Sequence, residues 1–303
     1  MLSRRQFLKA TGVATAGSIG FGGYAIAQPW GLGVTRYRVS PPQWPSGLRV
    51  KLAVLADLHA CEPWMGIDRI QGIVARTNAL QPDCVLLLGD YVAGHRMSRY
   101  SQAVPHKVWA GALAGLRAPL GVHAVLGNHD WWEDVAVQRR RCGPTRAGLA
   151  LQTAGIPVYQ NDCVRLSKDS TGFWLAGLGD QWAFSAKEHG PEQRRGYEGV
   201  DDLSRTLHHV GDDAPVILMV HEPDVFAQVP DRVALTVAGH THGGQVRVLG
   251  YAPVVPSRFG DRYVYGHIVE DNRHLVVSGG LGCSGFPVRF GSPPEIVLID
   301  VVA

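Results

Sequence analysis

The sequence predicts an α/β fold in which two β-sheets pack face to face and helices cover their outer sides. Strand-length apolar runs alternate with segments of helical spacing through the first half of the chain. Further strand-length runs recur up to the last residues, and a second sheet accounts for their number. The 303 residues are 46% hydrophobic and 18% charged, which is typical of a globular domain with a sizeable core.

Residues 1–27 are predicted to be a twin-arginine export signal. The pair Arg4-Arg5 precedes a weakly apolar run rich in Gly and Ala, which closes with a small-x-small cleavage sequence at 25–27. The twin-arginine translocase reads such signals and exports folded proteins. A Sec signal is one alternative. An uncleaved segment that tethers the protein to the inner membrane is another, because the apolar run is just long enough to lie in a bilayer.

Composition excludes one class of partner. Residues 1–27 carry three basic residues and no acidic ones, so the rest of the chain has equal numbers of both and a formal charge near zero. No basic excess remains for binding nucleic acid. The five cysteines have no CxxC spacing, and Cys142–Cys163 is the pair expected if a disulfide forms.

The remaining elements follow in chain order. Residues 28–48, rich in Pro and Gly, are expected to be a linker and an irregular entry to one domain over 49–303. The predicted strands lie at 49–57, 83–90, 121–130, near 158 and 164, at 172–180, 215–221 and 234–240, with three more after 260. The predicted helices lie at 67–80, from 105, at 145–154 and at 201–210. Residues 185–199 are expected to be a surface loop. Alternating strands and helices imply a largely parallel sheet with right-handed crossovers.

Five apolar runs share one feature, because each ends in side chains able to bind a metal ion. These endings are Asp57-Leu58-His59, Asp90, Asn128-His129-Asp130, His221 and His240-Thr241-His242. Ligands of α/β sheets collect at the carboxyl ends of strands, so these side chains converge if the strands are neighbours. One such ending is common in turns and cores, but five in succession favour a shared site. Several imidazoles together with carboxylates and an amide suit Mn, Fe, Zn or Co better than Mg or Ca.

The order DxH, GD, GNHD, H, GHxH resembles the calcineurin-like metallophosphoesterase superfamily, from about residue 49 to the end of the chain. The stretches HEPDVFAQ, GHTHGGQVR and GFPVRFGSPPE resemble its exported YaeI/YkuE-like branch. The resemblance implies a metallophosphoesterase domain over 49–303. Its fold would be a four-layer α/β/β/α sandwich of two mixed β-sheets flanked by helices, in agreement with the number of predicted strands.

The resemblance also implies a dinuclear metal centre, with two divalent ions of Mn, Zn, Fe or Co. Its ligands would be Asp57, His59 and His242 for the first ion, Asn128, His221 and His240 for the second, and Asp90 as a bridge. Two such ions lower the pKa of a shared water, and the resulting hydroxide would attack phosphorus. His129 would protonate the leaving oxygen, and Asp130 would orient His129.

Substrate contacts are expected from loops near the ligand motifs. The candidates at this rim are Trp64, His95, Arg96, Trp131 and Trp132, which could provide an apolar and cationic wall. Packing within a lid is the alternative for the tryptophans. Arg289 would either reach a phosphate or form a structural ion pair.

The predicted function is an exported, periplasmic, metal-dependent phosphohydrolase that suits phosphodiesters better than monoesters. Its partners would be a phosphoester substrate and the twin-arginine translocase, with peripheral association with the envelope and no nucleic acid. Two alternatives remain. One is a hydrolase of lipid-linked pyrophosphates of the UDP-diacylglucosamine type, although that chemistry belongs at the cytoplasmic face. The other is a non-catalytic metal-binding protein of the envelope.

Overall fold

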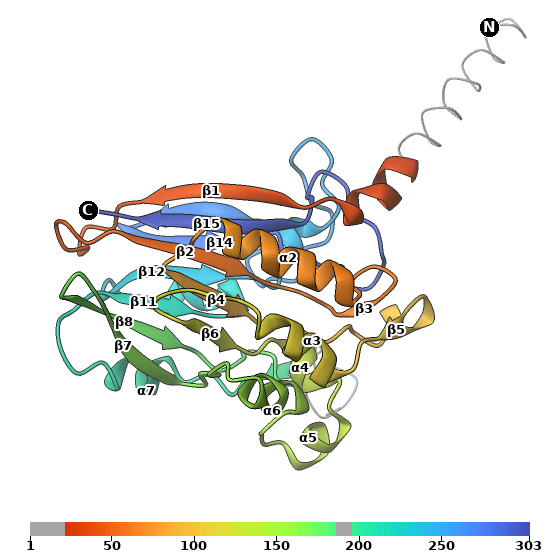
Figure 1. Cartoon of the computed structure of the whole chain (residues 1–303), viewed down its shortest axis with the longest axis horizontal. Helices are drawn as coiled ribbons and strands as arrows, with labels where there is room; N and C mark the ends of the chain where they lie inside the picture. The colour runs from red at the N-terminus through yellow and green to blue at the C-terminus, as the bar shows by residue number, and fades with distance from the viewer. Residues whose placement is uncertain (1–21, 186–195) are drawn as a thin grey trace, which may run out of the picture.

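Two large mixed sheets pack face to face in a computed structural model of the chain, which describes residues 22–185 and 196–303 (Figure 1). The first sheet has the order β1 (Gly33–Val39), β15 (Glu295–Val301), β2 (Val50–Leu55), β4 (Cys84–Leu88), β6 (Val122–Val125). The second has the order β13 (Gly266–Glu270), β14 (Arg273–Val277), β12 (Val233–Ala238), β11 (Val216–Met219), β8 (Thr171–Gly177), β7 (Asp162–Lys168).

Helices cover both outer faces. The first sheet is covered by α2 (Ile67–Ala79), α3 (His106–Leu113) and α6 (Arg146–Thr153), and the second by α7 (Leu203–His208) and η3 (Pro223–Gln228). Short elements fill the connections: α4 (Asn128–Trp132), α5 (Val135–Arg140), η1 (Gln28–Trp30), η2 (Met97–Arg99), η4 (His242–Gly244), β3 (Cys61–Glu62), β5 (Gln102–Ala103), β9 (Phe184–Ser185) and β10 (Tyr197–Glu198). None of the described helices is both long enough and apolar enough to cross a bilayer.

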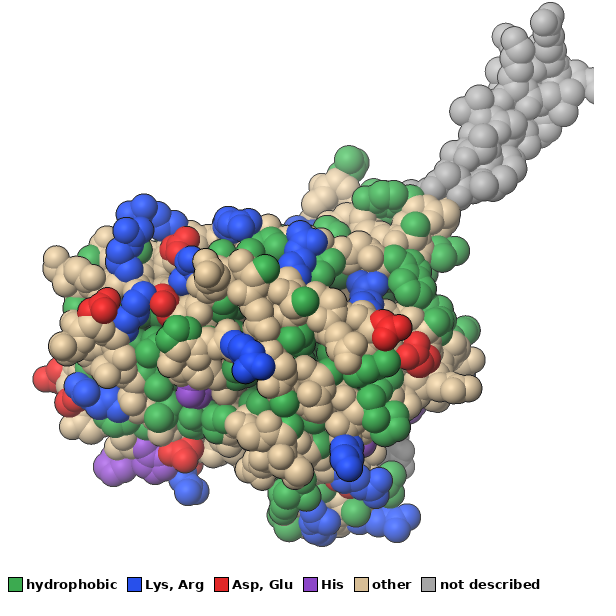
Figure 2. Space-filling model, in the orientation of Figure 1, with side chains coloured by type: hydrophobic (Ala, Val, Ile, Leu, Met, Phe, Trp, Pro, Cys, Tyr) green, Lys and Arg blue, Asp and Glu red, His purple; other side chains and the backbone are tan. Residues whose placement is uncertain are grey.

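The side-chain alternation of the strands produces the layers. In β2, Leu52 and Val54 point into the core between the sheets, whereas Ala53 and Leu55 point towards the helices. Because both faces of the central strands are buried, the strands are apolar throughout rather than alternating with polar residues. The four-layer α/β/β/α architecture expected from the sequence is confirmed. Basic and acidic side chains are interspersed on the face in Figure 2, as expected for a chain with little net charge.

The strand directions bring many chain connections to one end of the molecule. Strands β2, β4 and β6 are parallel, and so are β8, β11, β12 and β14. Strand β1 is parallel to β15, which is antiparallel to β2, so β1 begins where β2, β4 and β6 end. In Figure 1 this is the right-hand end, where the N-terminal segment leaves the domain.

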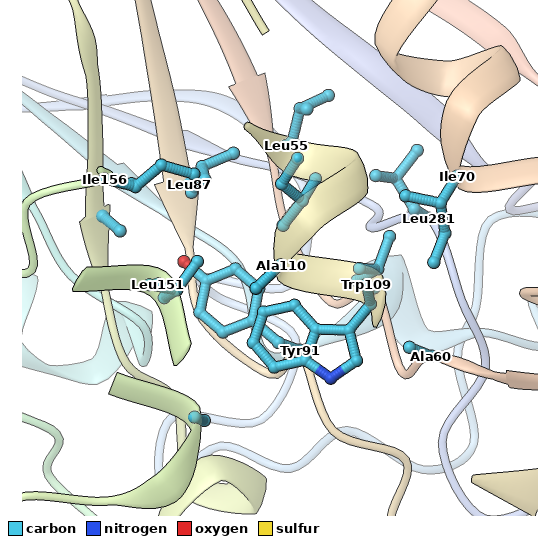
Figure 3. Close-up of a cluster of buried hydrophobic side chains, with 14 of the residues drawn as sticks. Leu55, Ala60, Ile70, Leu87, Tyr91, Trp109, Ala110, Leu151, Ile156 and Leu281 are labelled. Atoms are coloured by element: carbon cyan, nitrogen blue, oxygen red, sulfur yellow. The ribbon is translucent and has the colours of Figure 1, made fainter. Parts of the chain in front are cut away.

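The core outside the first sheet supports the loop after β4. The ring of Tyr91 stacks on Trp109 of α3 with 5.3 Å between centroids, among the apolar side chains drawn in Figure 3. The Tyr91 hydroxyl donates to the carbonyl of Val125 in β6 at 3.0 Å. Tyr91 directly follows Asp90, so this packing holds the backbone that presents the Asp90 carboxylate.

Two expectations are corrected. Residues 28–48 are not an irregular linker throughout, because 33–39 form strand β1 at the edge of the first sheet. The polar residues of this edge strand hide its alternation in the sequence. The Cys142–Cys163 disulfide is wrong, because all five cysteines are free. Residues 1–21 of the predicted signal and 186–195 of the predicted loop lie outside the described residues.

Candidate metal centre

Side chains from both sheets meet at the strand ends. All seven predicted ligands are at least 94% buried there: Asp57, His59, Asp90, Asn128, His221, His240 and His242. The predicted ligands of the first ion form one group, in which one donor atom each of Asp57, His59 and His242 lies within 4.8 Å of the others. The closest pair is His59 Nε2 and His242 Nε2, at 3.1 Å.

The predicted ligands of the second ion form an adjoining group. His221 Nε2 lies 3.2 Å from Asn128 Oδ1, and His240 Nδ1 lies 3.0 Å from the same oxygen. Asp90 stands between the two groups, because its Oδ2 lies 3.5 Å from His59 Nε2 and 3.4 Å from His221 Nε2. The carboxylate that the resemblance assigns as a bridge therefore lies between the two groups.

Backbone carbonyls orient three of the four imidazoles. The outward nitrogens of His59, His221 and His240 lie 3.1, 2.7 and 3.0 Å from the carbonyls of Val92, Leu88 and Pro256. A carbonyl accepts from an N–H, so the remaining ring nitrogen turns its lone pair inwards, as in metal-bound histidines.

The ligand backbones are strained. Asp57, His59, Asp90, His240 and His242 all have φ between 46° and 71°, in the left-handed region that non-glycine residues rarely occupy. Such strain persists only where surrounding structure enforces it, and it is concentrated at functional sites. Close approach also requires glycine, since a Cβ at Gly127 would lie 2.5 Å from Asp90 Oδ1.

The buried titratable groups of the cluster have pKa values shifted in different directions. Burial lowers the pKa of His59 to about 4 and, with the nearby His221, that of His240 to about 3, so both rings are neutral at pH 7. Burial raises the pKa of Asp90, but His221 and His129 outweigh it and hold the pKa well below its usual value. Burial lowers the pKa of His221, but the adjacent Asp90 raises it well above its usual value.

The donor set fits divalent cations. The inward ring nitrogens of His59, His221 and His240 lie within 3.0–3.3 Å of an amide oxygen and of other imidazole nitrogens. Such a cluster of buried donors lacks enough protons to satisfy it, whereas borderline divalent ions bind this mixture of nitrogen and oxygen.

His129 lies beside this cluster, but its partner differs from the predicted one. Its ring is 5.1 Å from that of His59, and its Nδ1 lies 3.4 Å from Glu133 Oε1. The carboxylate of Asp130 instead accepts from the backbone N–H groups of Asp90, Tyr91 and Gly127 at 2.9–3.0 Å. The expectation that Asp130 orients His129 is corrected: its oxygens join the loops after β4 and β6, and Glu133 faces His129.

The structure places the predicted substrate contacts in different surroundings. Trp132 contacts His129, with 5.2 Å between ring centroids, and donates to the carbonyl of Trp182. His95 and Arg96 are exposed and line a groove of about 240 Å³ with Tyr100 and Phe286. Trp64 is half-buried. The expectation that Trp131 contacts the substrate is corrected. Trp131 is 1% exposed and packs on Phe184 in the core, because it lies on the inner side of α4.

Arg289 does not reach towards a substrate, which corrects that expectation. Its guanidinium is fully buried and donates to the carbonyls of Gly279, Gly282 and Ser292. Its Nη2 lies 3.1 Å from His242 Nδ1. Arg289 therefore positions the His242 ring from the side opposite the cluster.

Arg289→Lys is expected to weaken metal binding by about 10–100-fold, since partners of ligands contribute that much to affinity. A lysine cannot make the same forked set of bonds. Competition with a chromogenic chelator measures the metal affinity, and KM measured at saturating metal should stay unchanged. A raised KM with unchanged metal affinity would instead indicate a direct contact with phosphate.

Sequence reasoning missed buried acids next to the second ligand group. Glu222 is 1% exposed, and one of its oxygens lies within 4.8 Å of donor nitrogens of His221 and His240. Asp180 follows β8 and is 2% exposed; burial, together with Glu222, raises its pKa well above the usual value. The stretch GLGD at 177–180 has the same apolar-run-then-Gly-Asp pattern as the ligand motifs, so Asp180 could have been found.

Comparisons with known proteins show the family of the chain. Residues 50–244 match the model of the calcineurin-like phosphoesterase family, and residues 1–18 match that of the twin-arginine translocation pathway signal sequence. The metallophosphoesterase YkuE of Bacillus subtilis is 30% identical over 310 residues, covering 99% of this chain and 98% of its own. The phosphodiesterase YaeI of Escherichia coli is 28% identical over 307 residues, covering all of both chains.

Among solved structures, a dimetal phosphatase from Danio rerio aligns with a TM-score of 0.41 at 14% identity, covering 77% of this chain and 88% of that one. The family model spans most of the domain, and its match includes all seven of the clustered donor residues. The chain belongs to the calcineurin-like phosphoesterase family and is a metal-dependent phosphoesterase with a twin-arginine signal.

Proposed function

We propose that this protein is a dinuclear phosphodiesterase that acts in the periplasm after export. The observation that carries the proposal is the position of Asp90 between two groups of buried donors, at 3.4–3.5 Å from an imidazole of each. A single ion would not need ligands on both sides of one carboxylate. The twin-arginine signal supports export, and the likeness to a phosphodiesterase over the whole chain supports the diester preference.

The residues of the site have different roles in this proposal. Asp57, His59 and His242 would hold one ion, Asn128, His221 and His240 the other, and Asp90 both. When bound, such a pair of cations lowers the pKa of a water and offsets the charge of phosphoryl oxygens. His129, 13% exposed at the edge of the cluster, is placed to protonate a leaving oxygen. Glu133 orients its ring, while Asp130 joins the two loops that carry Asp90 and Asn128.

A metal-dependence assay tests the proposal on the purified protein. We expect the chelator-stripped protein to be inactive, and reloading with Mn, Zn, Fe or Co to restore hydrolysis with two ions bound per chain. An aryl phosphodiester should be hydrolysed with a higher kcat/KM than the matched aryl monoester. A lipid-linked pyrophosphate serves as the third substrate. Activity at one ion per chain would rule out the dinuclear mechanism, and no hydrolysis with any metal would favour a metal-binding protein of the envelope.

A further inference from the structure

Exposed apolar side chains gather at the end of the molecule that carries the metal centre. Leu249 is fully exposed, Val254 is 75% exposed and Phe286 is 59% exposed. We name as the apolar collar the exposed residues Tyr24, Ile26, Trp30, Tyr100, Val248, Leu249, Tyr251, Val254 and Phe286. Figure 2 shows hydrophobic side chains gathered around the base of the N-terminal segment. Single exposed apolar residues are ordinary, but a gathering of this kind marks an interaction surface.

Contacts between the segments hold the collar together. The Tyr24 ring meets Phe290 edge to face, with 5.4 Å between centroids. The backbone of Arg247 donates to the carbonyl of Phe290 at 2.6 Å, which places the 248–251 turn beside the 286–290 loop. The rings of Tyr100 and Phe286 are 6.3 Å apart. Segments distant in sequence therefore form one surface.

The collar is joined directly to the metal centre. The Arg289 backbone N–H donates to the carbonyl of Ala25 at 3.0 Å, and the Arg289 side chain contacts His242. On the other side of the collar, the carbonyl of Pro256 contacts His240. The strand directions also place the collar beside the metal centre, because β1 begins at the end of the sheet where β2 and β4 end.

The charge of the collar segments differs from that of the domain as a whole. The segments 22–38, 94–104, 245–260 and 281–291 contain arginines and no Asp or Glu. Arg96, Arg99 and Arg258 are exposed among them. Arginine mixed with Trp, Tyr and Leu is the composition that binds an anionic membrane surface. A second copy would bring its own arginines against these, so like charges oppose a dimer through this surface.

We propose that the apolar collar docks on an anionic phospholipid bilayer, with the metal-binding end of the domain turned towards the headgroups. The chain ahead of the collar supports this occupant, because residues 10–18 carry no charge and belong to a signal that acts at a membrane. Aromatic side chains such as Trp30 and Tyr251 favour the interface between headgroups and acyl chains. This docking does not depend on the proposed catalytic activity.

Fluorescence quenching by lipids tests the docking. Full-length protein with Cys142→Ser and Cys163→Ser receives an environment-sensitive label at Leu249→Cys, and a matched protein receives it at Leu149→Cys on α6. Leu149 is also an exposed leucine, at 46% exposure, but it lies outside the collar. Both proteins are reconstituted into vesicles of phosphatidylglycerol and phosphatidylethanolamine, with and without brominated acyl chains. We expect blue-shifted emission and loss of signal to bromine at position 249, and neither change at 149.

Every other outcome contradicts the proposal. Equal quenching at both positions, or at neither, would mean that the collar does not face the bilayer. A label at 249 that is shielded before vesicles are added would indicate protein on the collar, either a second copy or another part of this chain. Quenching that persists unchanged in pure phosphatidylcholine would remove the anionic requirement. Phe286→Glu combined with Leu249→Glu, labelled at Val254→Cys, should lose the quenching while the thermal unfolding midpoint stays unchanged.

Discussion

Asp90→Asn is expected to lower kcat/KM for phosphoesters by about three orders of magnitude, since a metal pair contributes several kcal/mol of transition-state stabilisation. Asp90 is 98% buried and lies between both donor groups, so its replacement removes the carboxylate whose Oδ2 lies within 3.5 Å of both His59 and His221. The number of ions per chain should fall below two. Elemental analysis and steady-state kinetics on the same preparation measure both effects.

Asp83→Asn is the matched control for Asp90→Asn. Asp83 precedes the same strand, β4, at its opposite end, where it pairs with Lys168 at 2.7 Å and accepts from the backbone of Lys51. The control should keep both ions and full turnover, because an ion pair at the opposite end of β4 from the cluster affects stability alone. If Asp90→Asn retained two ions and near-normal kcat, the bridging role of Asp90 would be refuted.

His129→Ala is expected to lower kcat by about 10²–10⁴-fold while both ions stay bound, because general acid catalysis contributes that much. His129 lies at the edge of the cluster: its Nδ1 faces Glu133, and one of its ring nitrogens lies within 4.8 Å of donor atoms of His59 and Asp90. Alkyl esters, whose leaving oxygens need a proton, should lose more activity than nitrophenyl esters. An equal loss for both classes would argue against proton donation.

The pH profile provides a further test of the same residue. Burial lowers the pKa of His129, but Asp90 and the hydrogen bond that His129 donates to Glu133 outweigh burial and leave that pKa above its usual value. A raised pKa keeps the acid protonated to higher pH, so kcat should fall as pH rises through it. In Glu133→Gln this fall should move to lower pH, and in His129→Ala it should disappear. A profile identical in Glu133→Gln and the parent protein would show that Glu133 does not act on His129.

Local pattern predicted much of the fold and the ligands. The strand over 83–90 and the helix over 67–80 are confirmed as β4 and α2, because continuous apolar runs and helical spacing are properties of neighbouring residues. Strand β1 was missed because it lies at the sheet edge, where half-exposed residues leave no such pattern. The cluster of side chains could be expected because its members stand directly after apolar runs, and parallel strands bring their ends together; which of them would bind metal was implied by the family resemblance.

Partners within the site could not be predicted in the same way. That Glu133 rather than Asp130 faces His129 depends on how the short helix α4 turns against the loop after β4. The burial of Arg289 behind His242 depends on chain segments 47 residues apart meeting at one point.

The sequence by itself determined the fold class, the run of possible metal-binding side chains at the strand ends and the export signal, since these depend on residue type and on short spacings along the chain. The tertiary structure alone decided which acid meets which histidine, which arginine is buried, and that the apolar collar lies at the metal-binding end. Those outcomes depend on distances between segments far apart in the chain, which packing of the two sheets determines.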